Sequence, residues 1–152
     1  MAVYGFAPRG SFVPGIPSVR RQYTQTSAVA AAGDAATLTA GTAIVSTAGQ
    51  QLVGVYEKAA TSGGTAHINI TPYLMVFGDG DQDTTALAAT QIGTRFDHIG
   101  TTGAMLIDTN TTGATGQFSL LEFNSDLPAY KGDASIGLFM IVESMLYTSA
   151  DN

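Results

Sequence analysis

The chain of 152 residues contains neither cysteine nor tryptophan. Without cysteine there can be no disulfide bond, no thiolate metal site and no cysteine nucleophile. The lack of tryptophan, together with the few clustered aromatic residues outside the N-terminal segment, argues against a small carbohydrate- or ligand-binding domain that stacks sugar rings on aromatic side chains.

Charged residues are also scarce, at 12% of the chain, which is about half the usual share. Residues 1–33 contain Arg9, Arg20 and Arg21 and no acidic residue, whereas all twelve acidic residues lie in the rest of the chain. An acidic body repels phosphate, so we expect no binding of nucleic acid. A basic leader on an acidic body predicts instead a segment that contacts an acidic neighbour.

Long hydrophobic runs are missing as well. The longest, "YLMVF" at 73–77 and "GLFMIV" at 137–142, are far shorter than the roughly 20 residues that a membrane-spanning helix needs. The first residues, "MAVYGFAPRGSFVPG", lack the apolar core of a signal peptide. We therefore expect a soluble protein that is made in a cytoplasm and has no membrane partner.

What the chain does contain is a series of short β-branched runs separated by small residues, such as "ATLTAGTAIVST" at 36–47 and "QQLVGVYEKA" at 50–59. In "HINITPYLMVF" at 67–77, Pro72 predicts an edge, a bend or the start of a new strand. In "QFSLLEF" at 117–123, the apolar residues change phase, as they do at a β-bulge. Helical signal is limited to "TTALAATQI" at 84–92, with Asp83 as the N-cap and Gly93 after the end.

These patterns predict a mainly β fold with one short helix. A single β-rich domain is expected over residues 22–152, preceded by an extended N-terminal arm over residues 1–21. The arm contains Pro8, Pro14 and Pro17, which disfavour both a helix and a central strand.

The arm also carries apolar side chains that a disordered tail usually lacks. We expect it to dock on another chain, and the alternative is that it wraps back over its own domain. The candidate binding residues of the arm are Tyr4, Phe6, Arg9, Phe12, Val13, Ile16, Arg20 and Arg21.

Asp79, Asp81 and Asp83 alternate directly after an apolar run and resemble the start of a calcium loop. In an EF-hand counted from Asp79, however, the Gly of position 6 and the bidentate Glu of position 12 are replaced by Thr84 and Thr90. We interpret the stretch as a solvated turn that leads into the helix cap. The three aspartates remain candidates only for a looser calcium site.

No constellation of catalytic residues is recognisable, so the chain is not predicted to be an enzyme or to bind a cofactor. It has no G-x-S-x-G motif, and only His67 and His98 could act as a base near neutral pH. His67 alternates with Ile68 and is expected to face solvent, and His98 is expected to form a local hydrogen bond with Asp97.

The order of the segments resembles that of the head decoration proteins of tailed bacteriophages, which cement the capsid. The matching segments are "SVRRQYTQTSAVAAAGD" (18–34), "LTAGTAIVSTAGQQLVGVYEKA" (38–59), "ITPYLMVFGDGD" (70–81), "TTALAATQIGTRFDH" (84–98), "TTGAMLIDTNTTGATGQFSLLEF" (101–123) and "DASIGLFMIVES" (133–144). The chain departs from the family pattern in two ways: the aspartate loop lacks an Asp-Pro step, and the arm before Ser18 is longer and more aromatic.

This resemblance implies a compact β-barrel or β-tulip-like domain on the outer surface of the virion. The domain would bind the major capsid protein and clamp neighbouring subunits. Copies of the chain would form an oligomer, with a trimer favoured, or lie next to one another on the shell. A phage tail, fibre or adhesin-type β-domain, which could use the aspartates to bind calcium, is the alternative.

Overall fold

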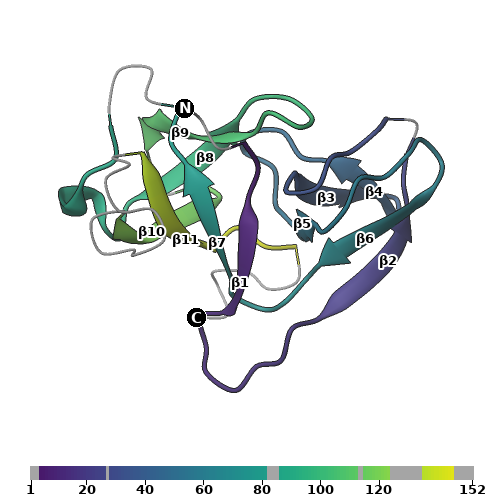
Figure 1. Ribbon diagram of the computed structural model, residues 1–152, viewed down its shortest axis with the longest axis horizontal. Helices are drawn as coiled ribbons and strands as arrows, with labels where there is room; N and C mark the ends of the chain where they lie inside the picture. Colours follow the sequence, from purple (N-terminus) through teal and green to yellow (C-terminus); the bar gives the residue numbers. More distant parts are fainter. Residues whose placement is uncertain (1–3, 27, 82–85, 113–114, 124–134, 146–152) are drawn as a thin grey trace.

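The protein, seen in a computed structural model, consists mainly of β-strands (Figure 1). The structure describes residues 4–26, 28–81, 86–112, 115–123 and 135–145. The strands are β1 (Ala7–Ser11), β2 (Arg20–Thr24), β3 (Ala35–Thr39), β4 (Thr42–Val45), β5 (Gly54–Tyr56), β6 (Thr65–Asn69), β7 (Leu74–Asp79), β8 (Arg95–Ile99), β9 (Leu106–Thr112), β10 (Phe118–Phe123) and β11 (Ile136–Ile141). The predicted mainly β class is therefore confirmed.

The strands form two antiparallel sheets that lie side by side, with β1 running between them (Figure 1). One sheet has the order β1-β7-β11-β10-β8-β9, and the other has the order β2-β6-β5-β3-β4. Single parallel bridges link Gly80, directly after β7, with Ile107 on the marginal strand β9 of the first sheet, and Gln25, directly after β2, with Ala43 on β4, the other margin of the second sheet. Across the described residues neither sheet closes into a barrel, so the architecture is that of a β-sandwich in coarse terms.

The buried side chains form two hydrophobic cores. The larger core is built around aromatic and aliphatic side chains of the six-stranded sheet, including Phe96, Phe118 and Phe139, all fully buried. The smaller core lies on the five-stranded sheet and includes Tyr56 and Ile68.

One long extended segment, bent in the middle, connects the two sheets. Residues 65–79 pass from β6 in one sheet to β7 in the other, and Pro72 lies at the crossing, as predicted. Tyr73 has a φ of 53°, in the left-handed region, so the backbone turns sharply at this point. Two N-terminal strands run antiparallel to the two halves of this stretch: β1 pairs with β7, and β2 pairs with β6.

The described part of the expected arm, residues 4–21, is therefore part of the fold rather than a separate arm. Phe6 is 2% exposed and belongs to the larger core, β1 is a sheet strand, and the expected boundary at residue 21 falls inside β2. Phe6 and the strands β1 and β2 follow the alternative expectation, that the N-terminal segment wraps back over its own domain. The physical reason is the burial of a large aromatic side chain, which the pattern of prolines and glycines did not reveal.

The expected β-bulge in β10 is confirmed by a register shift between Leu120 and Glu122. The expected helix over 84–92 is wrong for its described part, which contains only a 3₁₀ turn at Ala89–Gln91 (η1) after an extended Ala88. The amide of Gly93 donates to the carbonyl of Leu120, so pairing with the sheet replaces the continuation of a helix. Asp83, the expected N-cap, lies outside the described residues.

Candidate functional site

The most distinctive surface feature is the loop of residues 12–19, called here the exposed loop, which joins β1 to β2 at the crossing between the sheets. Ser11 is the partner of Leu74 and Arg20 is the partner of Asn69, so eight residues of the exposed loop face only the four residues 70–73 of the opposite strand. The exposed loop thus contains about four residues more than the strand pairing requires.

Both ends of the exposed loop are fixed to the crossing segment. The hydroxyl of Ser11 donates to the carbonyl of Pro72 at 2.7 Å, and the amide of Phe12 donates to the carbonyl of Tyr73 at 2.9 Å. At the other end, the amide of Val19 donates to the hydroxyl of Thr71 at 2.9 Å. The extra residues therefore project from closely spaced anchor points, as in a compact Ω-loop.

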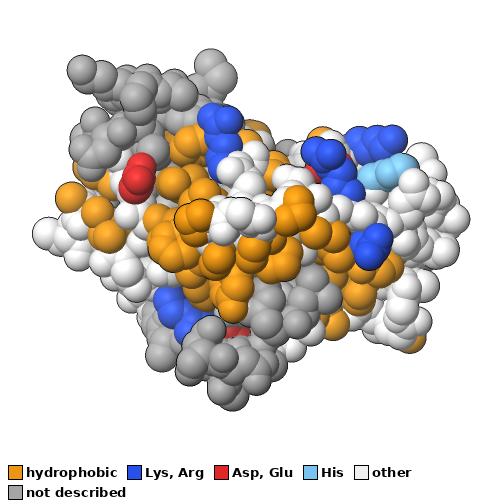
Figure 2. Space-filling model, turned by 90° about the horizontal axis from the view of Figure 1, so that it is seen from below, with side chains coloured by type: hydrophobic (Ala, Val, Ile, Leu, Met, Phe, Trp, Pro, Cys, Tyr) orange, Lys and Arg blue, Asp and Glu red, His pale blue; other side chains and the backbone are white. Residues whose placement is uncertain are grey.

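The projecting residues are mostly apolar and face solvent. Phe12 is 53% exposed and Val13 is 38% exposed, while Pro14 and Pro17 are exposed and Ile16 is half-buried. Figure 2 shows hydrophobic side chains gathered over the middle of this side of the molecule, with Lys and Arg side chains around them. Contiguous exposed apolar surface of this kind marks interaction sites in soluble proteins.

Arginines flank the exposed loop on both sides. The guanidinium of Arg9 on β1 lies 4.3 Å from the centroid of the Phe77 ring, a cation–π contact. The Nε of Arg20 on β2 lies 2.5 Å from the Oε1 of Glu57, and the Arg20 side chain remains 65% exposed. Arg9 and Arg20 line the same open groove, of about 580 Å³, which runs between β1 and the five-stranded sheet.

The structure places the predicted arm residues in several different environments. Phe12, Val13 and Ile16 lie on the exposed loop, and Arg9, Arg20 and Arg21 lie on the strands that flank it. Tyr4 is 57% exposed but lies at the other end of β1, where the amide of Gly5 donates to the carbonyl of Met105.

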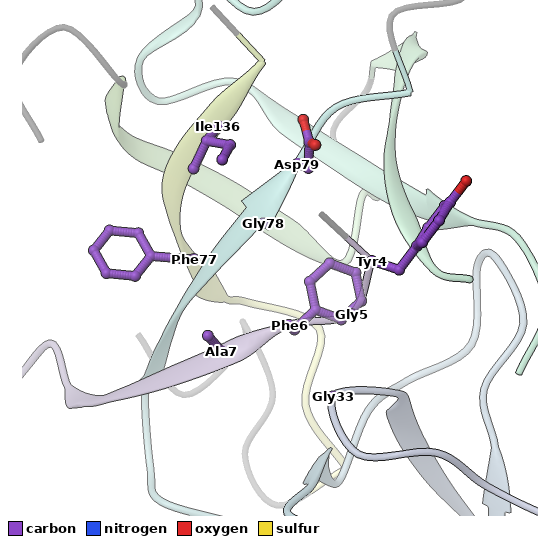
Figure 3. A pocket seen from close by; sticks show the side chains of 9 residues that line it. All are labelled: Tyr4, Gly5, Phe6, Ala7, Gly33, Phe77, Gly78, Asp79 and Ile136. Carbon is purple, nitrogen blue, oxygen red and sulfur yellow. The ribbon is translucent and has the colours of Figure 1, made fainter. Parts of the chain in front are cut away.

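Phe6 is not available as a surface anchor, which corrects its place among the candidate binding residues. Its ring lies against Gly78, where an added Cβ would come within 3.2 Å of a ring carbon. Figure 3 shows this ring on one side of β7 and the Phe77 ring on the other. Tyr4 and Phe6 line an apolar pocket of about 110 Å³, which also contains Asp79 and Ile136.

The aspartate stretch is not simply a solvated turn. Asp79 is 2% exposed at the end of β7, which corrects the expectation for that residue. Asp81 is half-buried and accepts hydrogen bonds from the amide of Thr109 at 3.2 Å and from its hydroxyl at 2.6 Å. Asp83 lies outside the described residues, and the described side chains include no group of three potential metal ligands.

His98, expected to bond with Asp97, is instead buried beside the larger core, and neither ring nitrogen is hydrogen-bonded to a described residue. Its ring centroid lies 6.3 Å from that of Phe6 and 6.5 Å from that of Phe118, both in edge-on geometry. Burial lowers the pKa of His98 to about 4, because the charged form would lose its hydration. His67 is half-buried on β6.

Sequence reasoning missed the structural role of Asp34, which is fully buried. Its two carboxylate oxygens accept hydrogen bonds from the amides of Ala31 and Gly103, each at 2.9 Å, and so link two distant loops. Burial raises the pKa of Asp34, although the two backbone amides act in the opposite direction. No sequence signal marked this residue, because one of its partners is remote in the chain.

No protein-family model matches this chain, and no curated protein matches it significantly. The described residues contain no helix that is long and apolar enough to span a bilayer.

Proposed function

We propose that the protein is a structural component of a tailed-phage virion that binds the outside of the capsid shell and clamps neighbouring major capsid subunits. The observation that carries this proposal is the exposed loop. Its additional residues have no role in the strand pairing, yet they present Phe12 and Val13 to solvent between flanking arginines.

The energetics suit a protein that binds many equivalent sites. Complete burial of a side chain such as that of Phe12 or Val13 contributes about 1.5–3 kcal/mol, which alone would give weak attachment. A shell contact that spans several subunits gains from effective concentration, so modest contacts are sufficient. The flanking arginines, of which Arg20 is already paired with Glu57, add charge-assisted bonds to acidic groups at the rim.

The partner in this proposal is the major capsid protein, and the location is the outer surface of the virion. Copies of the chain would assemble on the shell as an oligomer, with a trimer favoured by the family resemblance. The finer fold in this proposal is the β-tulip or barrel-like arrangement of that family. The bridge Gln25–Ala43, which joins the two margins of the five-stranded sheet, and the bridge Gly80–Ile107, which joins the end of β7 to the marginal strand β9, support it.

The first test is the number of copies per particle, measured by quantitative mass spectrometry against the major capsid subunit. A ratio close to one copy per subunit is the expected result. A handful of copies would indicate a tail or vertex component instead, and absence of the chain from purified particles would overturn the proposal.

The second test removes the part of the exposed loop that the fold does not need. Deletion of residues 13–16 leaves four residues opposite 70–73, so the free protein should keep its melting temperature and lose binding to particles. Ile99→Ser, which changes an apolar residue that is 45% exposed on β8, is the matched control and should bind normally. Normal binding by the deletion variant would show that the exposed loop is not the contact.

A further inference from the structure

The two strands that flank the exposed loop, β1 and β2, lie at the margins of their sheets. They differ in whether the side that faces away from the sheet is open to another strand. On β1, the amide of Phe6 just before the strand donates to the carbonyl of Gly33 at 2.7 Å, and Pro8 has no amide hydrogen to offer. Proline and local pairing of this kind prevent another strand from adding to a sheet margin. The open side of β1 is therefore blocked.

Two hydrogen bonds show which backbone groups of β2 face β6. The amide of Ile70 donates to the carbonyl of Val19 at 2.8 Å. The amide of Gln25 donates to the carbonyl of Gly64, also at 2.8 Å. Bonded and non-bonded positions alternate along an antiparallel pair, and the register of β2 with β6 has no shift. The backbone groups that face β6 are those of Val19, Arg21, Tyr23 and Gln25, and the groups that face away are those of Ser18, Arg20, Gln22 and Thr24.

At the start of β2, the outward backbone groups have no bond to another described residue. In the part of the chain that the structure describes, the next strand on this side, β4, lies near the end of β2, where Gln25 bridges Ala43 and the amide of Thr26 donates to the carbonyl of Ala43 at 3.0 Å. Ser18, Arg20 and Gln22 are exposed, and Figure 1 shows β2 along the outer margin of its sheet. Three successive outward positions are enough for an extended segment to add as a further strand.

The charges on β2 indicate what kind of segment fits. Arg20 and Arg21 are consecutive, so their side chains lie on opposite faces of the strand, and both are exposed. Two β2 strands paired across a two-fold axis would bring these arginines against one another, which disfavours a second copy as the partner. A strand with acidic side chains on both faces complements them, and Arg9 in the adjacent groove adds to the same field.

We infer that the open side of β2 accepts, by backbone pairing, an extended acidic segment of the capsid subunit, next to the apolar contact that the exposed loop makes. This inference rests on the proposed function and specifies how the shell is held. The backbone bonds supply attachment that does not depend on sequence, and the arginines select the acidic segment.

The test uses Gln22, whose amide faces away from β6. Gln22→Pro removes that outward donor and places a proline ring on the open side without touching a bond to β6, whereas Gln22→Ala keeps the backbone and is the control. In binding to particles that lack the protein, we expect Gln22→Pro to weaken the apparent affinity by about tenfold or more relative to Gln22→Ala. Equal binding by the two variants would overturn the inference and leave the proposed function standing.

Two further readouts complete the experiment. If Gln22→Pro melts at a much lower temperature than Gln22→Ala, hydrogen exchange on the wild-type protein replaces the comparison of the variants. The amides of residues 20–24 should exchange more slowly when the protein is bound to particles. Unchanged exchange would overturn the inference. If the wild-type chain itself does not bind the particles, the proposed function fails first, and the inference fails with it.

Discussion

Phe6 and Phe12 lie in the same Pro- and Gly-rich stretch, yet they occupy opposite environments. Phe6 is 2% exposed in the larger core, and Phe12 is 53% exposed on the exposed loop. Composition alone could not separate them, because what buries Phe6 is its position against Gly78 on a strand more than seventy residues away. For the same reason, a simple truncation of residues 1–17 would remove part of the core along with the exposed loop.

Phe6→Ala is therefore expected to destabilise the protein by about 3–5 kcal/mol, since it removes a fully buried aromatic side chain and leaves a cavity. Phe12→Ala should change the stability by less than about 0.5 kcal/mol, because its side chain already faces solvent. Urea unfolding of the two variants measures both values. A similar loss of stability in both variants would contradict the described environments.

The buried His98 makes the stability depend on pH. Its pKa is lowered to about 4 in the folded protein from about 6.5, so between these values the unfolded chain binds more protons than the folded one. The stabilisation is fully present above about pH 6.5 and is lost as the pH falls toward 4, by about 3 kcal/mol in total. Urea unfolding at pH 7 and at pH 4 should show this decrease.

The contribution of His98 is isolated by comparing variants. Asp34 acts in the opposite direction, because its raised pKa means that acidification through that range favours the folded state. His98→Leu should abolish most of the decrease between pH 7 and pH 4, and His67→Leu, at a half-buried position on β6, should retain it. An unchanged decrease in His98→Leu would show that other groups cause the acid sensitivity.

At the level of elements, the strands were predictable where the cause is local. The β-branched runs, the break at Pro72 and the bulge in β10 all depend on residues within one segment. The pairing of β1 and β2 with residues 65–79 depends on contacts far apart in the chain, and so it was missed. Of the site, the arm composition predicted a set of apolar binding residues but not which of them are exposed, and the open side of β2 emerges only from the register.

The approach of β5 to β6 depends on a single glycine. A Cβ placed on Gly54 would lie 1.9 Å from the backbone carbonyl oxygen of Asn69, a separation that no rotamer change can relieve. Gly54→Ala should therefore force the two strands apart and destabilise the protein by more than about 3 kcal/mol, or prevent folding. Urea unfolding and the soluble yield measure this effect.

Gly41→Ala in the turn between β3 and β4 is the matched control for that substitution. An added Cβ would have no neighbour within 4 Å there, and only the φ of 81° opposes it, at a cost of about 1 kcal/mol. Comparable stability of the two alanine variants would mean that β5 and β6 are not as close as described.

At the scale of the whole molecule, the two sheets are joined through shared core residues. Leu52, from the segment before β5, and Val55, on β5, pack in the larger core, and Val45 contacts both cores. Leu52 also exchanges backbone hydrogen bonds with the segment after β11: its amide donates to the carbonyl of Glu143, and its carbonyl accepts from the amide of Met145, both at 2.8 Å. If one sheet unfolded, the other would lose part of its packing.

We therefore expect the two sheets to unfold in one cooperative transition. In native-state hydrogen exchange with increasing urea, the slowest amides of β6 and of β10 should give the same free energy of opening and the same dependence on urea. Leu52→Ala should lower both values together, because its side chain lies where the sheets meet. If β6 instead opened at clearly lower urea than β10, the five-stranded sheet would be a separate unit, and contacts made by β2 and the exposed loop could be released without unfolding the larger core.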